Sequence, residues 1–143
     1  LHMLRSGPVT KEMLQRFGKV ERPKRNRSNE APEAPGQLAN HYAPVTPLRL
    51  LRKFEDFKPE AGKKYGLLSY CGAEKTGFIN AYEWDQVEQL SPGNGKLAEA
   101  AVRFFFVLRQ LDESGVDEII AEPVSETGLG VAIMDKLRRA SVR

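Results

Sequence analysis

The sequence is poor in cysteine and histidine, the residues that build most disulfide frameworks and zinc sites. Its 143 residues include one cysteine, Cys71, and two histidines, His2 and His41, which lie in different segments. A single cysteine makes no disulfide within a chain, and two distant histidines do not suggest a metal-ligand set. We therefore expect no internal disulfide and no resident metal or other cofactor, and we interpret Cys71 as a buried, inert thiol.

Long hydrophobic runs are absent as well. The chain has no stretch of about 18 or more apolar residues, so the sequence predicts no membrane-spanning helix. The first residues also lack the basic-then-apolar pattern of a secretory signal. Together with the near absence of cysteine, these features favour a protein of the cytoplasm without membrane partners.

The familiar enzyme signatures are missing too. There is no Walker loop, no dinucleotide glycine fingerprint after a strand and no Gly-x-Ser-x-Gly elbow. Gly128 and Gly130 open a predicted helix, and the amino end of a helix can meet an anion. We favour the interpretation of a closely packed helix-start turn over that of an anion site.

The acidic residues do not form an obvious catalytic pair. Glu122 and Glu126 lie near each other at the end of a predicted strand, whereas Asp112, Asp117 and Asp135 are scattered. We interpret these groups as solvated charges or local ion pairs, with a paired-carboxylate site as the alternative.

Basic residues gather in the amino-terminal part of the chain. Residues 1–30 hold eight Lys/Arg against three Glu, a net charge of +5, whereas the other residues hold 14 against 16. The excess is densest at Arg22, Lys24, Arg25 and Arg27. A solvated linker is the first interpretation, and an arm that attracts phosphate or RNA is the alternative.

Residues 34–48 have the composition of a stiff connector. Proline recurs at positions 32, 35, 44 and 47, and the segment carries the adjacent pair His41 and Tyr42. Proline fixes φ, removes a backbone donor and biases the preceding residue toward extended structure. We therefore predict an extended segment that presents the His–Tyr pair at a defined place.

Short apolar segments predict the strands of the second part of the chain. They cover residues 48–51, 66–71, 78–82 and 86–90, and a further run at 119–121 is typical of a strand buried on both faces. Tyr82 and Trp84 suggest either a stacking surface or the edge of the core, and we favour the core.

Helices are predicted from apolar stripes and caps. Residues 97–111 carry a continuous stripe, widened by Phe105, and a last helix follows Gly128. Near the amino terminus, Thr10 is a plausible cap for a single helix that ends at Gly18 and whose apolar face needs a partner. Strands followed by helix, strand and helix predict an α/β fold, a small three-layer Rossmann-like domain with a mainly parallel sheet.

Several segments together resemble the C-terminal part of the two-domain threonylcarbamoyl-AMP synthases of the YrdC/Sua5 type. The resemblance covers nearly the whole chain and rests on the order of modest motifs. These are the Leu-Arg-Ser-Gly-Pro-Val-Thr segment at 4–10, the Ala-Pro-Gly and His-Tyr-Ala-Pro segments at 34–36 and 41–44, and the segments at 108–112, 122–124 and 128–140.

This resemblance implies three parts. Residues 1–20 would close a YrdC-like catalytic domain, residues 21–46 would be the linker, and residues 47–143 would be an α/β C-terminal domain. The family makes threonylcarbamoyl-AMP and pyrophosphate from L-threonine, bicarbonate and ATP with magnesium, for the modification of certain tRNAs by partner proteins. The chain by itself would not be catalytic.

The resemblance also implies site residues. In the family the linker folds over the catalytic cleft, so Tyr42 would contact ATP or the adenylate, and Arg5 would contact a phosphate or the nucleotide. His41 and Pro44 would shape the lid. Two other functions remain open from the sequence: an independent nucleotide- or small-molecule-binding module with its ligand at the carboxyl ends of the strands, and an RNA-binding accessory domain.

Overall fold

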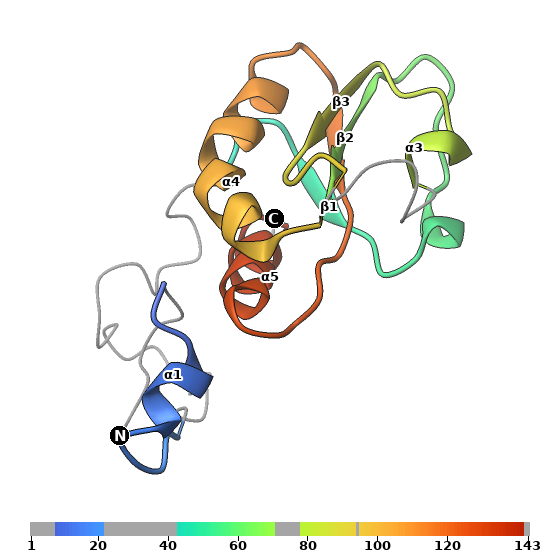
Figure 1. Cartoon of the computed structure of the whole chain (residues 1–143). Coiled ribbons are helices and arrows are strands. Elements are labelled where there is room, and N and C mark those ends of the chain that lie inside the picture. The colour runs from blue at the N-terminus through green and yellow to red at the C-terminus, as the bar shows by residue number, and fades with distance from the viewer. Residues whose placement is uncertain (1–7, 22–42, 71–77, 94, 142–143) are drawn as a thin grey trace, which may run out of the picture.

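The computed structural model describes residues 8–21, 43–70, 78–93 and 95–141. Figure 1 shows the elements in their order along the chain. They are α1 (Lys11–Gln15), β1 (Leu48–Leu50), the 3-10 turn η1 (Phe54–Asp56), β2 (Tyr65–Ser69), α3 (Phe78–Ala81), β3 (Gln86–Gln89), α4 (Leu97–Asp112), β4 (Glu118–Ala121) and α5 (Leu129–Ala140).

The four strands form one parallel sheet in the order β1-β4-β2-β3. The last strand in sequence therefore lies inside the sheet, between β1 and β2. Ile119, Ile120 and Ala121 of β4 are fully buried, because both faces of a parallel sheet are covered. The predicted α/β class and the parallel sheet are confirmed.

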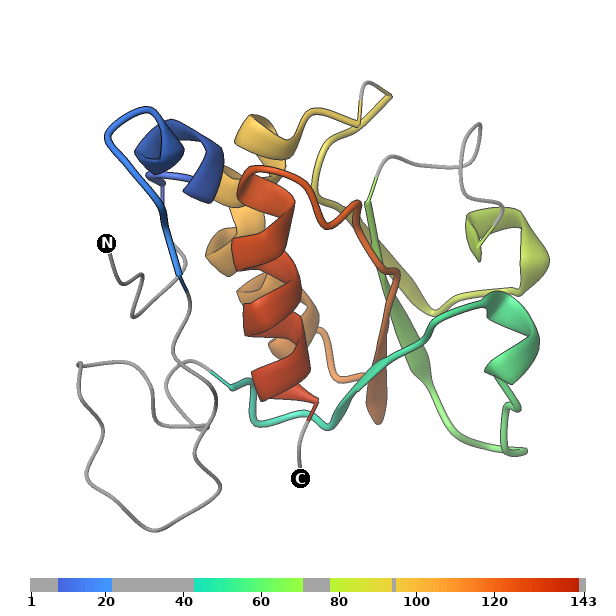
Figure 2. The ribbon, with the colours of Figure 1, turned by 90° about the horizontal axis from the view of Figure 1, so that it is seen from below.

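The sheet lies between two layers (Figure 2): α4 and α5 cover one face, and η1 and α3 lie on the other. Ala100, Phe104 and Leu111 of α4 and Leu137 of α5 are buried in the main core. The predicted stripe of α4 is confirmed except at one point. Phe105 is 40% exposed and so does not widen the buried stripe, and the Lys136 ammonium lies 4.3 Å from its ring centroid.

An aromatic cluster fills the second layer. Phe57 packs edge-on against Tyr65, with ring centroids 5.0 Å apart, and it lies 5.1 Å from both Tyr82 and Trp84. The indole Nε1 of Trp84 donates a hydrogen bond of 2.8 Å to the carbonyl of Phe78. Tyr82 and Trp84 thus belong to the edge of the core, as predicted, because their rings pack against neighbouring aromatic side chains.

The prediction of a strand at residues 78–82 is wrong. Phe78–Ala81 forms the single helical turn α3. Phe78 is buried in the aromatic cluster, whereas Asn80 and Ala81 are exposed. A short apolar run does not distinguish a strand from a buried turn of helix, and here the burial of one ring decides the outcome.

Gly66 of β2 allows α4 to approach the sheet closely. A Cβ atom at this position would lie 3.0 Å from Leu111 Cδ2 and 3.2 Å from Val116 Cγ2. These distances are tighter than ordinary van der Waals contact. Leu111, near the end of α4, therefore occupies the space that a side chain at position 66 would need.

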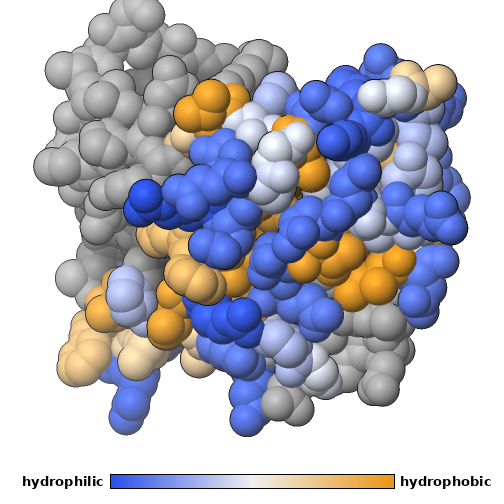
Figure 3. All heavy atoms as spheres, turned by 90° about the horizontal axis from the view of Figure 1, so that it is seen from above, coloured by the Kyte–Doolittle hydropathy of each residue, from blue (hydrophilic) through white to orange (hydrophobic). Residues whose placement is uncertain are grey.

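The amino-terminal helix has the predicted cap. Thr10 Oγ1 accepts a hydrogen bond of 3.3 Å from the backbone N–H of Met13, and Gly18 has a φ of 141°. Met13 and Phe17 are 54% and 82% exposed, so the apolar face of α1 is uncovered. Figure 3 shows the face of the molecule that is at the top in Figure 1. The described residues of this face are mostly hydrophilic, with smaller hydrophobic areas between them.

Candidate functional site

The end of the linker is attached to α4 through its backbone. The N–H groups of Val45 and Thr46 donate hydrogen bonds of 3.0 and 2.7 Å to the two carboxylate oxygens of Asp112. The Thr46 hydroxyl lies 3.4 Å from the Asp112 carbonyl oxygen. Pro44 is buried beside this attachment, whereas the Val45 side chain is 83% exposed.

The attachment leads directly into the sheet. Pro47 accepts a hydrogen bond of 2.8 Å from the Ile119 backbone N–H, and β1 begins at the next residue. The linker therefore joins the domain at the edge strand β1. Val45 and Thr46 are bonded to α4, and the next residue, Pro47, is bonded to β4. Asp112 thus accepts two backbone amides from a distant segment, contacts that the sequence alone does not predict.

Only one of the four predicted site residues is described by the structure. Pro44 is buried at the attachment to α4. Arg5, His41 and Tyr42 lie outside the described residues, so their roles remain predictions. The same holds for Cys71 and for the basic residues Arg22, Lys24, Arg25 and Arg27.

A buried carboxylate marks the carboxyl edge of the sheet. Glu122, directly after β4, is 1% exposed. It accepts hydrogen bonds from the Ser69 hydroxyl at 3.1 Å and from the Tyr70 N–H at 2.8 Å. The prediction of a solvated charge is wrong for Glu122, because donors from Ser69 and Tyr70, more than 50 residues away, take the place of water around the buried carboxylate.

The same edge holds the entry to α4. The Tyr70 hydroxyl donates to the Gly95 carbonyl at 2.6 Å. The Ser91 hydroxyl donates to Glu99 at 2.7 Å and accepts from the Lys96 N–H at 2.8 Å. Glu99 lies in the first turn of α4, where a carboxylate interacts favourably with the helix dipole. These bonds fix the loop between β3 and α4 against β2.

The connections of the sheet diverge beside Glu122. The chain leaving β2 leads to α3 on one face, and the chain leaving β4 leads to α5 on the other face (Figure 2). Because β2 and β4 are neighbours, their carboxyl ends form a topological switch point, the place where open α/β sheets bind ligands. Ser69 and Glu122 stand at this point, which makes it the candidate small-molecule site of the domain.

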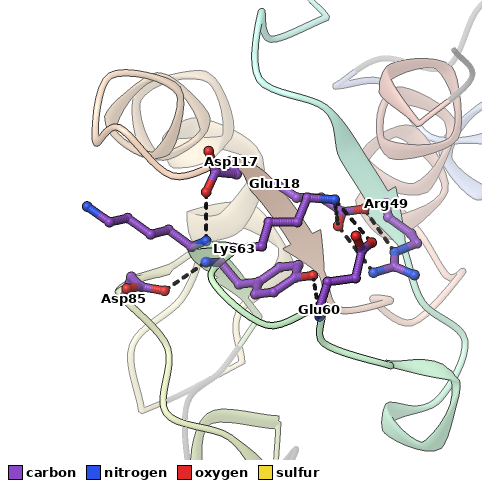
Figure 4. A network of polar contacts seen from close by, with 8 residues as sticks. Arg49, Glu60, Lys63, Asp85, Asp117 and Glu118 are labelled. Atoms are coloured by element: carbon purple, nitrogen blue, oxygen red, sulfur yellow. Dashed lines mark hydrogen bonds and ion pairs between the residues drawn. The ribbon is translucent and has the colours of Figure 1, made fainter.

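The amino edge of the sheet holds a charged network (Figure 4). Arg49 Nη2 donates to Glu118 Oε2 at 3.3 Å, and Arg49 Nε lies 3.1 Å from Glu118 Oε1. The Lys63 ammonium lies 3.4 Å from Glu60 and 3.6 Å from Glu118. The hydrogen bond with Glu60, with help from the charge of Glu118, raises the pKa of Lys63 above its ordinary value of 10.5.

Two aspartates of this edge cap the start of β2. Asp117 accepts from the Lys64 N–H at 2.7 Å, and Asp85 accepts from the Tyr65 N–H at 2.8 Å (Figure 4). The Tyr65 hydroxyl accepts from the Glu60 N–H at 3.0 Å. Charges and amides at this edge pair with one another, so the network positions the start of β2.

The turn before α5 is closely packed. A Cβ atom on Gly130 would lie 1.8 Å from the Ser125 carbonyl oxygen, so only glycine fits. Within α5, Asp135 and Arg139 form an ion pair of 2.7 Å, and Arg138 pairs with Glu126. The prediction of a close-packed helix start is confirmed, as are the ion pairs of Asp135 and Glu126.

The described part of the chain holds no cluster of metal ligands and no helix that could span a membrane. No group of three or more His, Cys, Asp or Glu side chains within residues 8–21, 43–70, 78–93 and 95–141 is placed to hold a metal ion. None of the helices described is long and apolar enough to cross a membrane.

Known proteins resemble this chain over nearly its full length. The family model described as threonylcarbamoyl-AMP synthase, C-terminal domain, matches residues 9–142. The threonylcarbamoyl-AMP synthase of Bacillus subtilis is 33% identical over 149 residues, which cover 97% of this chain and 41% of that protein. The Pyrococcus abyssi synthase is 35% identical over 127 residues, which cover 80% of this chain and 34% of that protein.

Solved structures agree with this fold. The crystal structure of P. abyssi Sua5 complexed with L-threonine has a TM-score of 0.71 at 28% identity, and the match covers 98% of this chain and 42% of that one. A variant of the same protein, with an adjacent histidine and tyrosine replaced by alanine, has a TM-score of 0.70 at 28% identity, and that match covers 98% of this chain and 41% of the variant. The chain thus spans less than half the length of these relatives. It belongs to the threonylcarbamoyl-AMP synthase family and matches that family's C-terminal domain.

Proposed function

We propose that this chain is the linker and C-terminal domain of a two-domain enzyme that condenses L-threonine, bicarbonate and ATP into threonylcarbamoyl-AMP, with release of pyrophosphate and water. The membership of the family supports this proposal. The product would serve the threonylcarbamoyl modification of tRNA by other proteins, and the enzyme would work in the cytoplasm. The chain alone would be catalytically silent, because the part that matches covers 41% of the B. subtilis relative.

The proposed division has three parts: the end of the catalytic domain at residues 1–20, the linker at 21–46 and the C-terminal domain at 47–143. The exposed side chains of α1 support the first part. The helix has only five residues, and Met13 within it and Val9 and Phe17 beside its two ends are all more than half exposed. Such a helix does not stay folded on its own, so its apolar face suits the body of a preceding domain.

The linker would act as the lid of the catalytic cleft. The observation that carries this proposal is the fixed end of the linker, where Pro44 is buried and the next two amides bind Asp112. Tyr42 is two residues before Pro44 in the sequence. A side chain so close to a rigid attachment can be held over a ligand at a small cost in conformational entropy.

Each proposed site residue has a chemical reason. The acyl-adenylate product is a mixed anhydride that water hydrolyses, so a lid that excludes water protects it. The ring of Tyr42 can pack on the adenine, and the guanidinium of Arg5 can bind phosphate oxygens in a bidentate way. His41 and Pro44 would set the shape of the lid. Magnesium would enter with ATP at the catalytic domain, since the described residues offer no cluster that fits it.

The relatives offer independent support for the His–Tyr pair. One solved structure of the P. abyssi protein holds L-threonine, and another carries alanine in place of an adjacent histidine and tyrosine. This chain contains a single His–Tyr dipeptide, at residues 41 and 42. We propose that His41 and Tyr42 correspond to the pair replaced in that variant.

The test compares the full-length protein with this chain. With threonine, bicarbonate and ATP, the full-length protein should release pyrophosphate and form the adenylate, and the 143-residue chain should do neither. Tyr42→Ala in the full-length protein should lower the yield of adenylate by about tenfold or more, whereas Tyr42→Phe separates ring packing from the hydroxyl hydrogen bond. Adenylate formation by the chain alone would refute the proposal.

A second candidate function is a small-molecule-binding module at the switch point of the sheet. The buried carboxylate of Glu122 beside the ends of β2 and β4 favours it. A thermal-shift screen of the chain with nucleotides and amino acids tests this candidate. A ligand that stabilises the parent chain but not Glu122→Gln supports it, and the absence of any such ligand removes it.

A further inference from the structure

We infer that the exposed face of α4 binds the same face of a second copy of this chain, with the two helices antiparallel. The resulting dimer would be symmetric, because each helix presents the same residues to the other. This inference goes beyond the proposed function and does not depend on it. It rests on the spacing, the exposure and the charges of one row of residues on α4.

Two large apolar side chains lie on the surface of α4. Val102 is 84% exposed and Phe106 is 63% exposed, and because they are four residues apart they are neighbours on one face of the helix. The opposite face packs on the sheet, with Phe104 and Leu111 buried in the main core. Figure 1 shows α4 at the outside of the domain. The helix thus has two apolar faces, and the described residues of the chain bury one of them.

The exposed row continues on both sides of these two residues. It consists of residues at intervals of three, four, three and four: Glu99, Val102, Phe106, Arg109 and Glu113. The first four lie in α4, and the last is its C-cap residue. Helices that pair along a narrow seam in coiled coils have this spacing. A row with apolar side chains in its middle and charges at its ends therefore indicates a short contact with another helix.

The charges of this row select the orientation of the two helices. In an antiparallel pair in which Val102 faces Phe106 of the partner subunit, Glu99 faces Arg109 of the partner subunit. The reason is that Glu99 is three residues before Val102 and Arg109 is three residues after Phe106. The two-fold axis repeats these contacts, so a pair of opposite charges flanks the apolar pairs at each end. A small apolar side chain also faces a large one, which favours close packing.

Other arrangements of the same two faces bring like charges together. A parallel pair in register would place Glu99 against Glu99 of the partner subunit and Arg109 against Arg109 of the partner subunit. An antiparallel pair centred on Phe106 would place Glu99 against Glu113 of the partner subunit. Like charges that face each other across an interface are unfavourable. The row is therefore complementary to itself in the antiparallel register that pairs Val102 with Phe106 of the partner subunit.

The charged residues of the row already have partners within the chain, and they keep them in such a dimer. Glu99 accepts a hydrogen bond of 2.7 Å from the Ser91 hydroxyl, and its other oxygen lies 3.8 Å from Arg103. Arg109 Nε lies 2.7 Å from Glu113, but the Arg109 side chain is 76% exposed and its guanidinium has further N–H donors. The contacts between copies add to these pairs. At the exposed rim they determine the orientation more than the affinity.

The dimer should be weak. With 16 residues, α4 is about 24 Å long, and each copy brings two apolar side chains to the contact. Such a contact belongs to the smallest class of protein interfaces. We therefore expect a dissociation constant on the order of 100 µM.

Sedimentation velocity of this chain and of the full-length protein tests the inference. Both should change from monomer to dimer between about 10 µM and about 1 mM. Phe106→Glu and Val102→Glu should each raise the dissociation constant by about tenfold or more, because a charge then lies in the apolar centre of the contact. The matched control is Phe17→Glu, the same change at an exposed phenylalanine beside α1, and it should dimerise like the parent.

Charge reversal tests the register. Glu99→Arg alone and Arg109→Glu alone each bring like charges together, so each variant should dimerise less than the parent. An equimolar mixture of the two variants should dimerise better than either one, because every facing pair then has opposite charges. Damage to the helix itself would weaken the mixture as well. Glu99→Arg also removes the bond with Ser91, so circular dichroism checks its fold, and Phe106→Glu remains the test if it does not fold.

Four results would overturn the inference. The first is a monomer at every concentration up to about 1 mM, and the second is a Phe106→Glu variant that dimerises like the parent. The third is equal weakening by Phe17→Glu, which would assign the association to α1. The fourth is a full-length protein that stays monomeric although this chain dimerises, since the rest of the protein would then cover the α4 row. A mixture of the charge variants that stays monomeric would refute the antiparallel register, and the inference with it.

Discussion

The carboxylate of Asp112, at the end of α4, lies 2.7 Å from the backbone nitrogen of Thr46, which precedes β1. This contact joins two parts of the chain that are 66 residues apart, and a second bond from Val45 supports it. Hydrogen bonds to charged groups contribute about 1.5–3 kcal/mol each, less where water competes. The attachment of the linker end to Asp112 therefore stabilises the domain, in addition to its proposed role.

We predict that Asp112→Ala lowers the free energy of unfolding of the 143-residue chain by about 1–3 kcal/mol, because two amides lose their acceptor. Asp112→Asn should have a smaller effect, since its amide oxygen still accepts one bond. Urea denaturation followed by circular dichroism measures the difference. Glu113→Gln should stay within about 0.5 kcal/mol of the parent, and an equal effect of all three changes would contradict the prediction.

The buried carboxylate of Glu122 leads to a second prediction. Glu122→Ala should destabilise the chain by about 2–3 kcal/mol, because the Ser69 hydroxyl and the Tyr70 N–H would be left without this acceptor. Ser69→Ala should cost about 1 kcal/mol, since it removes one donor and leaves the other bond in place.

The control for Glu122 is Glu126→Gln, four residues on. Glu126 is exposed and pairs with Arg138 at the surface, where ion pairs contribute about 0–1 kcal/mol. The comparison is again made by urea denaturation. If the change at Glu126 were as damaging as the change at Glu122, the burial of Glu122 would not be the reason for its effect.

Replacement of Gly130 by alanine should destabilise the chain, opposite to the usual effect of alanine in a helix. Alanine normally stabilises a helix relative to glycine by about 1 kcal/mol. Here the added methyl group would lie 1.8 Å from the Ser125 carbonyl oxygen, so the backbone before α5 must move. Gly130→Ala should therefore lower the melting temperature, and a rise on differential scanning calorimetry would show that the turn relaxes freely.

Lys63 gives a prediction for alkaline pH. Its pKa is raised above 10.5, chiefly by the hydrogen bond with Glu60, so the folded state holds the proton more tightly than the unfolded state. The stabilisation is present below the unfolded pKa and is lost as the pH rises through the folded pKa. An NMR titration of the Lys63 side chain should show this raised pKa.

Glu60→Gln should move the pKa of Lys63 back toward 10.5, because it removes the largest cause of the shift. Glu113 pairs with Arg109, so Glu113→Gln should leave the pKa of Lys63 unchanged. The difference in unfolding free energy between the parent and Glu60→Gln should narrow from about pH 9 to about pH 12. A difference that widens over this range would contradict the assignment.

The elements that the sequence predicts well are those whose signal is local and long. The stripe of α4 is repeated over four turns, and the run Ile119–Ala121 reflects a strand covered on both faces. The turn at Phe78 has no such repetition. Its state depends on the aromatic rings around it, which come from several segments and are not visible in the local pattern.

The polar contacts show the same limit. Glu122 and Asp112 look alike in the sequence, as acids near the ends of elements, yet their donors come from 52 to 67 residues away. One signal was available for Asp112, an acidic residue at the carboxyl end of a helix, where the dipole disfavours it. The Pro44 burial agrees with a linker end that is part of the domain, whereas the roles of Arg5, His41 and Tyr42 remain predictions.

The missing side chain at Gly66 has an effect beyond the core. Leu111 occupies the space that a Cβ on Gly66 would need, and Asp112 is the next residue along α4. The contact of α4 with Gly66 therefore lies directly before the residue that holds the linker end. An alanine at position 66 would press on the Leu111 side chain, one residue before the carboxylate that accepts the amides of Val45 and Thr46.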